Sequence, residues 1–381
     1  MLAQLLFEWT GYSLFNHRLF RAGAAAIFAS SMIFILMPIF ISFLTKLNAT
    51  SDFDEAIKKS PPIMGGVLVV AIVSLATFCF SNLNGYVGSI LIIMIAYCVV
   101  GGIDDVMKIR TKRLIDAGKM DKGSYQAKAD GLSPRVRLLL YFIFSLAVAG
   151  FAYKFIPNMD GHLTVPFIKK EIWFPYLPNW AFILLISFVI TSTANGANFT
   201  DGLDTLVSVP LITSACFIGI VAYVSGNFDL SEYFLIPNIP GVDELFPICT
   251  AIVGGLLAYL WFNSPPAQIY MGDGGSIGLG GAIGMMFVLV KAELFLPIIG
   301  IIFLMEAFSV LTQIAFFKLT RKIEGEGRRI FRRAPIHDHF ILGFMDQGLN
   351  RNEAVSKTVW RFHLISLFAL IIGTLIFFKV R

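Results

Sequence analysis

The chain has 381 residues, of which 56% are hydrophobic and 14% are charged, and its mean hydropathy is +0.75. Soluble domains contain about 45–50% apolar and about 25% charged residues, so this composition excludes an ordinary soluble domain, a disordered chain and a nucleic-acid-binding protein. The formal net charge of +5 is less informative than the positions of the charges.

Apolar windows long enough to span a bilayer follow one another along the chain. One span needs about 20 predominantly apolar residues, and we place ten windows near 23–43, 65–81, 86–103, 137–155, 177–195, 205–224, 246–262, 275–291, 295–317 and 359–379. We therefore expect an all-α polytopic membrane protein of about ten transmembrane helices, with residues 1–381 forming a single integral membrane domain. Residues 1–22 are amphipathic and favour an interfacial segment.

Lysine and arginine concentrate in three loops. The segments 44–64, 104–137 and 318–361 hold 22 of the 30 basic residues, and such loops remain in the cytoplasm. The parity of the spans places the polar junctions 195–204 and 263–276 on the same face. We therefore expect a cytoplasmic-face active site, with a basic cytoplasmic loop over 318–358.

The four cysteines lie in or at the ends of apolar windows and include no Cys-x-x-Cys pair. We interpret them as small hydrophobic residues, not as disulfides or metal ligands. They are Cys79, Cys98, Cys216 and Cys249.

Two adjacent carboxylates, Asp104 and Asp105, end the third apolar window. Neighbouring anions at the edge of a low-dielectric region repel each other, which favours their retention where a cation or a proton relay offsets the repulsion. The start of a solvated loop would contain the same residues. The pair therefore indicates a site only in combination with other segments.

Amide and carboxylate side chains recur at every third position after the fifth window. Residues three apart lie on one side of a helical turn. Helix capping explains one or two such residues, but not four. The pattern therefore favours a ligand-binding segment that contains Asn195, Asn198, Asp201 and Asp204.

A single aspartate, Asp273, stands among glycines at the start of the eighth window. Mg²⁺ takes one or two protein carboxylates and leaves its other positions to water and phosphate oxygens. Asp273 is therefore the candidate metal ligand. The later glycines, from Gly278 to Gly284, are better explained by close packing of membrane helices.

Two further segments are basic. Four arginines within residues 328–333 lie beside His337 and His339 and would suit a diphosphate, although a loop facing anionic lipid would contain the same arginines. Lys58 precedes a pair of prolines and could contact an anion or serve only membrane topology.

Together these segments place carboxylates, amides and cations at one membrane face. That combination predicts Mg²⁺-assisted phosphoryl transfer from a water-soluble nucleotide-type donor to a lipid acceptor, because such chemistry depends on positioning and on stabilising spread negative charge. A lipid or nucleotide-sugar transporter is the alternative from another class, but a transporter keeps its polar groups near the bilayer midplane.

In order and spacing, these segments resemble the phospho-N-acetylmuramoyl-pentapeptide transferases, a branch of the polyprenyl-phosphate N-acetylhexosamine-1-phosphate transferases. The matching motifs are Lys58 to Gly66, Asp104-Asp105, Asn195 to Asp204, Asn263 to Asp273 and Ala334 to Phe340. The resemblance implies transfer of phospho-N-acetylmuramoyl-pentapeptide from UDP-N-acetylmuramoyl-pentapeptide to undecaprenyl phosphate, giving lipid I and UMP in peptidoglycan synthesis. It also implies a Mg²⁺-dependent homodimer in the bacterial inner membrane.

The resemblance further implies roles for individual residues. Asp273 would bind Mg²⁺, Asp104 would deprotonate the lipid phosphate, and Asp105 would support that site. The uridine pocket would contain Lys58, Asp204, Asn263 and Tyr270, the catalytic floor Asn195, Asn198 and Asp201, and the sugar-diphosphate site His337, His339, Arg332 and Arg333. Direct transfer and transfer through a covalent aspartyl intermediate are both compatible with these roles.

The chain departs from the family pattern at several positions. Asp338 stands between the two histidines where a third histidine is usual, and Ile341 replaces an acidic residue. A related enzyme that transfers N-acetylglucosamine-1-phosphate or a similar sugar to the same lipid therefore remains the alternative within the enzyme class.

Overall fold

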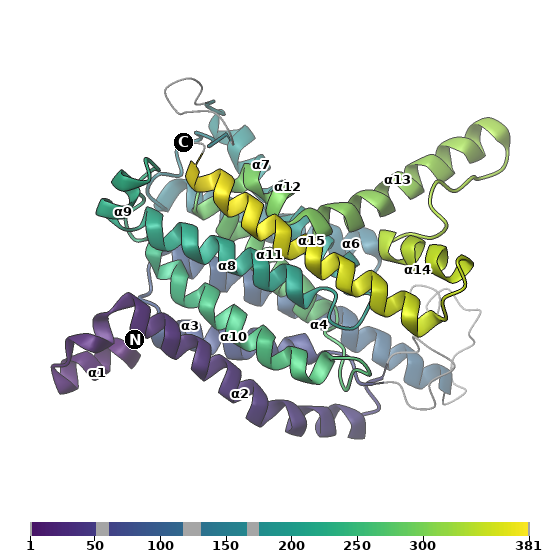
Figure 1. Cartoon of the computed structure of the whole chain (residues 1–381), viewed down its shortest axis with the longest axis horizontal. Helices are drawn as coiled ribbons and strands as arrows, with labels where there is room; N and C mark the ends of the chain where they lie inside the picture. Colours follow the sequence, from purple (N-terminus) through teal and green to yellow (C-terminus); the bar gives the residue numbers. More distant parts are fainter. Residues whose placement is uncertain (1, 51–60, 117–130, 166–174, 380–381) are drawn as a thin grey trace.

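The computed structural model describes residues 2–50, 61–116, 131–165 and 175–379, and within these residues the regular elements are helices, apart from two isolated β-bridges. Figure 1 shows the long helices packed side by side, with α1 (Leu2–Thr10) at one end of the bundle and α13 (Ile301–Glu324) projecting at the other. The predicted all-α class is confirmed.

Each of the ten predicted windows contains a helix. Among the described residues, eight helices are long and apolar enough to cross a membrane, whereas α3 and α11, of 16 and 17 residues, fall short of that length. The chain is thus a multi-pass membrane protein. Besides α13, the long helices are α2 (Arg18–Lys46), α3 (Gly65–Phe80), α4 (Gly85–Asp116), α6 (Pro134–Phe155), α7 (Asn179–Thr200), α8 (Ser208–Ser225), α10 (Leu245–Asn263), α11 (Asp273–Leu289) and α15 (Arg351–Lys379).

Short elements connect these helices. One of them, α14 (Ile336–Asp346), contributes to the site and follows the projecting end of α13 (Figure 1). The others are α9 (Phe228–Tyr233), α12 (Leu296–Ile299) and the 3₁₀ turns η1 (Ser13–Asn16), η2 (Val242–Glu244) and η3 (Glu293–Phe295).

Helix α11 forms the centre of the bundle. Every residue from Gly274 to Leu289 is buried. Glycine permits this packing: a Cβ on Gly280 would lie 2.7 Å from the Cβ of Ala197 in α7, and one on Gly101 of α4 would lie 2.6 Å from the carbonyl oxygen of Asp273. The small residues therefore bring α4 and α7 against the start of α11, as the packing interpretation of its glycines predicts.

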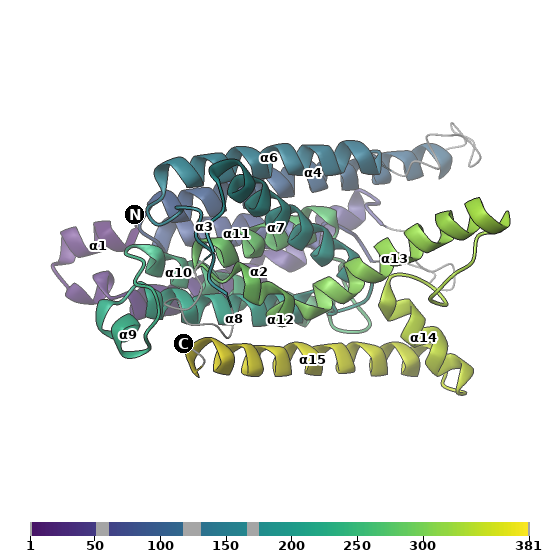
Figure 2. The same ribbon diagram turned by 90° about the horizontal axis from the view of Figure 1, so that it is seen from above.

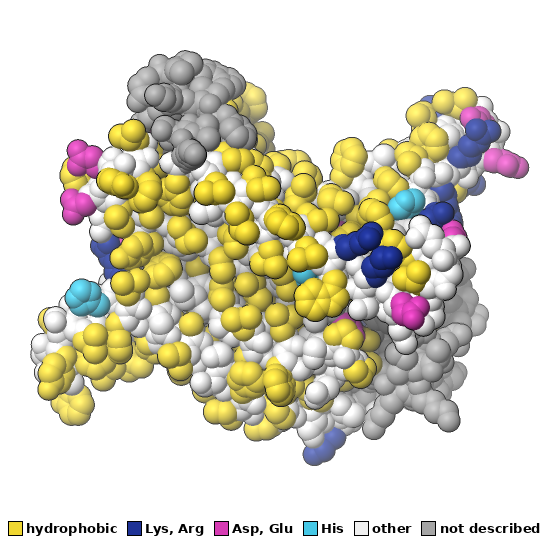
Figure 3. Space-filling model, in the orientation of Figure 1, with side chains coloured by type: hydrophobic (Ala, Val, Ile, Leu, Met, Phe, Trp, Pro, Cys, Tyr) yellow, Lys and Arg dark blue, Asp and Glu magenta, His cyan; other side chains and the backbone are white. Residues whose placement is uncertain are grey.

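On the face shown in Figure 3, hydrophobic side chains cover the middle of the molecule. Lysine and arginine side chains lie over the projecting end of α13 and where α14 meets α15. The four cysteines are free, with Cys98 and Cys249 buried and the other two partly buried, which agrees with their interpretation as small hydrophobic residues.

The N-terminal segment does not end where the sequence predicts. Helix α2 begins at Arg18, so the last residues of the expected interfacial segment 1–22 belong to a spanning helix. Arg21 is buried there and donates to both carboxylate oxygens of Glu244 at 2.7 Å. It also donates to the carbonyl oxygen of Phe80 at 3.1 Å. This ion pair joins α2, the end of α3 and the start of α10 at the end of the bundle opposite α14.

Replacing Arg21 tests this cross-link. Removing one partner of a buried ion pair costs about 3–5 kcal/mol because the other charge stays buried. We therefore expect Arg21→Gln to lower the unfolding temperature of the purified protein by several degrees. Lys46→Gln, at the exposed far end of the same helix, is the matched control. Equal unfolding temperatures for the two variants would contradict the role of the Arg21–Glu244 pair.

Candidate active site

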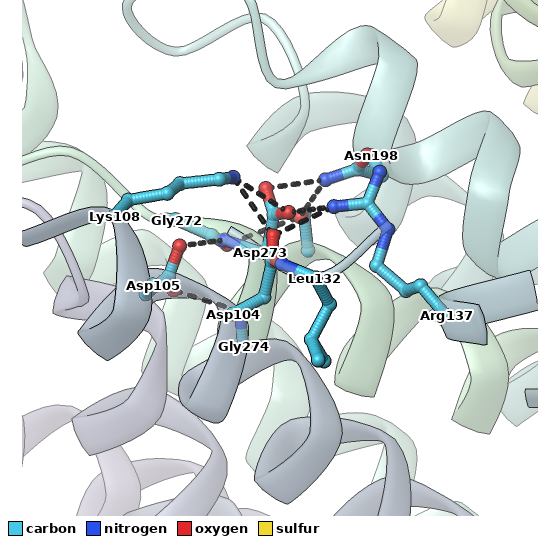
Figure 4. A network of polar contacts seen from close by, with 10 residues as sticks. Asp104, Asp105, Lys108, Leu132, Arg137, Asn198, Gly272, Asp273 and Gly274 are labelled. Carbon is cyan, nitrogen blue, oxygen red and sulfur yellow. Dashed lines mark hydrogen bonds and ion pairs between the residues drawn. The ribbon is translucent and has the colours of Figure 1, made fainter. Parts of the chain in front are cut away.

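Two aspartates from different helices share two cations at the α14 end of the bundle (Figure 4). Lys108 Nζ lies 2.9 Å from Oδ2 of Asp104 and 3.0 Å from Oδ2 of Asp273. Arg137 Nη1 lies 2.8 Å and 2.5 Å from the same two atoms. The Asp104 side chain is only 1% exposed and that of Asp273 is 15% exposed, so the two carboxylates are held together by opposite charge away from bulk water.

Asp105 holds the first turn of α11. Its carboxylate accepts the backbone N–H groups of Asp273 at 3.2 Å and Gly274 at 3.1 Å, which satisfies two of the free donors of a helix start. Gly272 precedes that turn with φ of +77°, and a Cβ there would lie 2.8 Å from Oδ2 of Asp105. The glycine therefore allows the backbone to approach the carboxylate.

The last turn of α7 contributes an amide, and the residue that follows the helix contributes a carboxyl group. Asn198 Nδ2 donates to Oδ1 of Asp273 at 2.8 Å. Burial raises the pKa of the Asp201 carboxyl well above its usual range, and the charges of Asp273 and Asp105 raise it further. Asp201 therefore holds a proton more readily than an exposed aspartate does. The structure brings four of the predicted aspartates and Asn198 to one place.

A second group of predicted residues joins two loops. Asn263 accepts the N–H of Thr205 at 2.8 Å and donates to the carbonyl of Ile269 at 2.9 Å. Asp204 accepts the N–H of Ala267 at 3.2 Å; burial raises its pKa, and this hydrogen bond opposes the shift. The Asn263 amide thus bonds to backbone groups that set the loop geometry.

Tyr270 extends this connection to α3. Its backbone N–H donates to the carbonyl of Pro62 at 2.9 Å, and its carbonyl accepts the N–H of Gly65 at 2.9 Å. The end of the motif Lys58 to Gly66, at the start of α3, therefore lies beside the segment before α11. Lys58 of that motif lies outside the described residues.

His337 connects α14 to α13 and to the motif Asn195 to Asp204. Its Nδ1 lies 3.1 Å from both carboxylate oxygens of Glu306, and both side chains are buried. A Cβ on Gly202 would lie 2.7 Å from Nε2 of His337. Because a carboxylate only accepts, the contact requires the proton on Nδ1. Glu306 thereby orients the imidazole with Nε2 against the segment 201–204.

The remaining residues of the basic segment bond to one another. Nδ1 of His339 accepts the backbone N–H of Arg332 at 3.1 Å. Arg332 pairs with Asp346 at 3.0 Å, and Arg333 pairs with Asp338 at 3.1 Å. Both arginines are largely exposed, and no hydrogen bond or ion pair within the described part of the chain joins them to the buried aspartates.

Asn195 does not reach the carboxylates either. Its Nδ2 donates to the carbonyl of Thr191 at 2.8 Å within α7. The predicted series Asn195, Asn198 and Asp201 therefore divides: the last two residues contact the start of α11, and the first bonds to its own helix.

Sequence reasoning missed three residues. Lys108 follows Asp104 by four positions and so lies on the same face of α4. Glu306 is the only charged residue between Ile301 and Phe317, and an ionisable group inside a spanning segment is a functional candidate in its own right. Arg137 lies between exposed apolar residues in the first turn of α6, where it resembles a topogenic charge.

Comparison with known proteins agrees with this geometry. Residues 87–291, more than half of the chain, match glycosyl transferase family 4. The chain is 37% identical over 378 residues to the phospho-N-acetylmuramoyl-pentapeptide-transferase of Syntrophus aciditrophicus (strain SB), covering 96% of each chain. It is 35% identical over 370 residues to that of Campylobacter jejuni (strain RM1221), covering 95% of this chain and 96% of the relative.

The chain belongs to glycosyl transferase family 4. This confirms the resemblance seen in the sequence and identifies the protein as a transferase. The part matched to family 4 contains the aspartate cluster of α4, α7 and α11, whereas Glu306 and His337 lie beyond it. The contact between His337 and Gly202 therefore joins the matched region to the segment that follows it.

Replacing Glu306 in this family 4 transferase tests how His337 is oriented. Glu306→Ala removes a charged hydrogen bond worth about 1.5–3 kcal/mol, so we expect the transfer rate to fall about 10- to 100-fold. Glu306→Gln keeps an oxygen that accepts a hydrogen bond from Nδ1 of His337, so its transfer rate should fall less than that of Glu306→Ala. Glu324→Gln, partly exposed on the same helix, should leave the rate unchanged. A folded Glu306→Ala enzyme with the wild-type rate would show that the pair does not serve transfer.

Proposed function

We propose that this protein transfers phospho-N-acetylmuramoyl-pentapeptide from UDP-N-acetylmuramoyl-pentapeptide to undecaprenyl phosphate, giving lipid I and UMP. The two relatives named phospho-N-acetylmuramoyl-pentapeptide-transferase, which match nearly the whole chain, carry the choice of substrates. The aspartate cluster at the end of the apolar bundle supports the choice, because a polyprenyl phosphate and a nucleotide donor meet where membrane and water meet.

The donor atoms of the cluster suit Mg²⁺. Oδ2 of Asp104 and Oδ2 of Asp273 face the same two cations, and Asn198 adds an amide beside them. The two carboxylate oxygens are hard ligands, whereas Asn198 turns its N–H to Asp273. Within the described ranges, no three His, Cys, Asp or Glu side chains form a complete metal site. A divalent ion would therefore take one or two carboxylates here and its other ligands from phosphate and water.

The proposed roles follow from these contacts. Mg²⁺, when bound at Asp273, would stabilise negative charge on the donor diphosphate. Asp104 would accept the proton of the acceptor phosphate, and its ionised form is stabilised by Lys108 and Arg137. Asp105 would fix the position of Asp273 through the first turn of α11. His337, oriented by Glu306, would bind the donor from the segment 201–204.

The membrane arrangement is part of the proposal. The basic loops of the sequence support a cytoplasmic position for the site in a bacterial inner membrane. The resemblance supports a homodimer, for which the exposed apolar residues of α2, α13 and α15 offer surface. Two copies would each carry a complete aspartate cluster, because that cluster comes from one chain.

A UMP-release assay with both substrates tests the reaction and the metal. We expect Asp273→Asn to abolish UMP release while the protein still inserts in the membrane, because the amide keeps the shape of the side chain but not its charge. Chelation should stop the wild-type enzyme, and added Mg²⁺ should restore it. Asp229→Asn, an exposed aspartate in α9, is the control. Full turnover by Asp273→Asn would contradict the metal assignment.

The donor preference is tested at Asp338. This partly buried residue pairs with the exposed Arg333 at 3.1 Å, and ion pairs that reach solvent contribute about 0–1 kcal/mol. We therefore expect Asp338→His to fold and to keep the rate with UDP-N-acetylmuramoyl-pentapeptide. UDP-N-acetylglucosamine, offered in parallel, should give no lipid product with either protein. Loss of activity in Asp338→His would show that this loop has acquired a different role.

A further inference from the structure

Arg137 makes both of its carboxylate contacts with one nitrogen. Nη1 donates to Asp104 at 2.8 Å and to Asp273 at 2.5 Å. A guanidinium has five N–H donors on three nitrogens. The structure shows no hydrogen bond from Nη2 or Nε to any residue that it describes. The side chain thus holds the aspartates at one corner and leaves one edge of its plane for another acceptor.

This arginine lies at the boundary between the bundle and the lipid. Figure 2 shows α6 along the outer edge of the bundle. The neighbours of Arg137 are exposed: Val136 by 45%, Leu138 by 52% and Leu139 by 57%. The Arg137 side chain itself is 20% exposed. A molecule with an apolar tail and an anionic head could therefore contact both the leucines and the guanidinium.

We propose that Arg137 binds the phosphate of the lipid acceptor through its Nη2–Nε edge while Nη1 remains on the aspartates. This inference rests on the proposed function and adds a binding residue to it. Arginine binds phosphate oxygens in a planar, two-point geometry. The donor diphosphate offers the same chemistry, but the exposed apolar residues on either side of Arg137 favour the ligand that carries a hydrocarbon chain.

The arrangement also places the acceptor beside the proposed base. One guanidinium would contact the phosphate at one edge and Asp104 at its Nη1 corner. The positive guanidinium would then lie between the phosphate and the carboxylate, so these two anions could be neighbours. Arg137 would thus reduce their repulsion and hold the phosphate within reach of Asp104.

Direct binding measurements test this assignment without turnover. Full-length protein in lipid nanodiscs is titrated with a polyprenyl phosphate, with the matching unphosphorylated polyprenol and with UDP-N-acetylmuramoyl-pentapeptide. We expect Arg137→Gln to raise the Kd for the polyprenyl phosphate about tenfold and to change the Kd for the nucleotide less than about twofold. Arg137→Lys, which keeps the charge but not the two-point edge, should raise the Kd for the polyprenyl phosphate about threefold. Arg135→Gln, an exposed arginine in the same turn, should change neither.

The results separate this inference from the proposed function. A wild-type protein that does not distinguish the polyprenyl phosphate from the polyprenol contradicts the proposed function itself. If the wild type does distinguish them, unchanged affinity in folded Arg137→Gln overturns the role of Arg137. If Arg137→Gln loses affinity only for the nucleotide, the Nη2–Nε edge binds the donor diphosphate, and the assignment to the lipid acceptor is also overturned. Should Arg137→Gln fail to fold, Arg137→Lys is judged by the same criterion.

Discussion

Negative charge at the end of an apolar bundle determines how the site is built. An isolated carboxylate away from water is costly, and it persists only with a partner. Asp104 and Asp273 therefore lie where Lys108 and Arg137 can reach both. These contacts connect three separate helices, so the shared charges also fix the relative positions of α4, α6 and α11.

Close packing makes that convergence possible. The glycines of α11 remove the side chains that would separate it from α4 and α7. Asp105 then takes the free N–H groups at the start of α11, which sets the direction of Asp273. Charge, helix capping and small residues act at the same turn, so changing any one of them would also displace the others.

Much of the architecture could be predicted from local sequence. The ten apolar windows correspond to ten helices because a spanning segment is defined by length and composition alone. Asp104, Asp201 and Asp273 could be found because each lies at the edge of an apolar window beside other acidic, amide or glycine residues. Arg137 and Glu306 could not be given partners in this way, since their contacts with Asp104 and His337 depend on how separate helices pack.

Because contacts depend on how helices pack, the motifs could not show which of their residues contact one another. Asn195 and Asn198 have the same spacing and chemistry, yet one bonds within α7 and the other across to Asp273. The resemblance places Asn263 in a nucleotide pocket, and the structure adds that its amide joins two loops. A motif in which one residue type recurs indicates which segment approaches a ligand. It does not show which contact each residue of the motif makes.

Helix α6 also links the site to the thickness of the bilayer. Its 22 residues extend about 33 Å, close to the hydrocarbon core of about 30 Å. A thinner membrane is accommodated by tilting such a helix. Because the first turn of α6 carries Arg137, tilting would shift the guanidinium relative to the two aspartates. The physical state of the surrounding lipid would therefore act on the charge balance of the site.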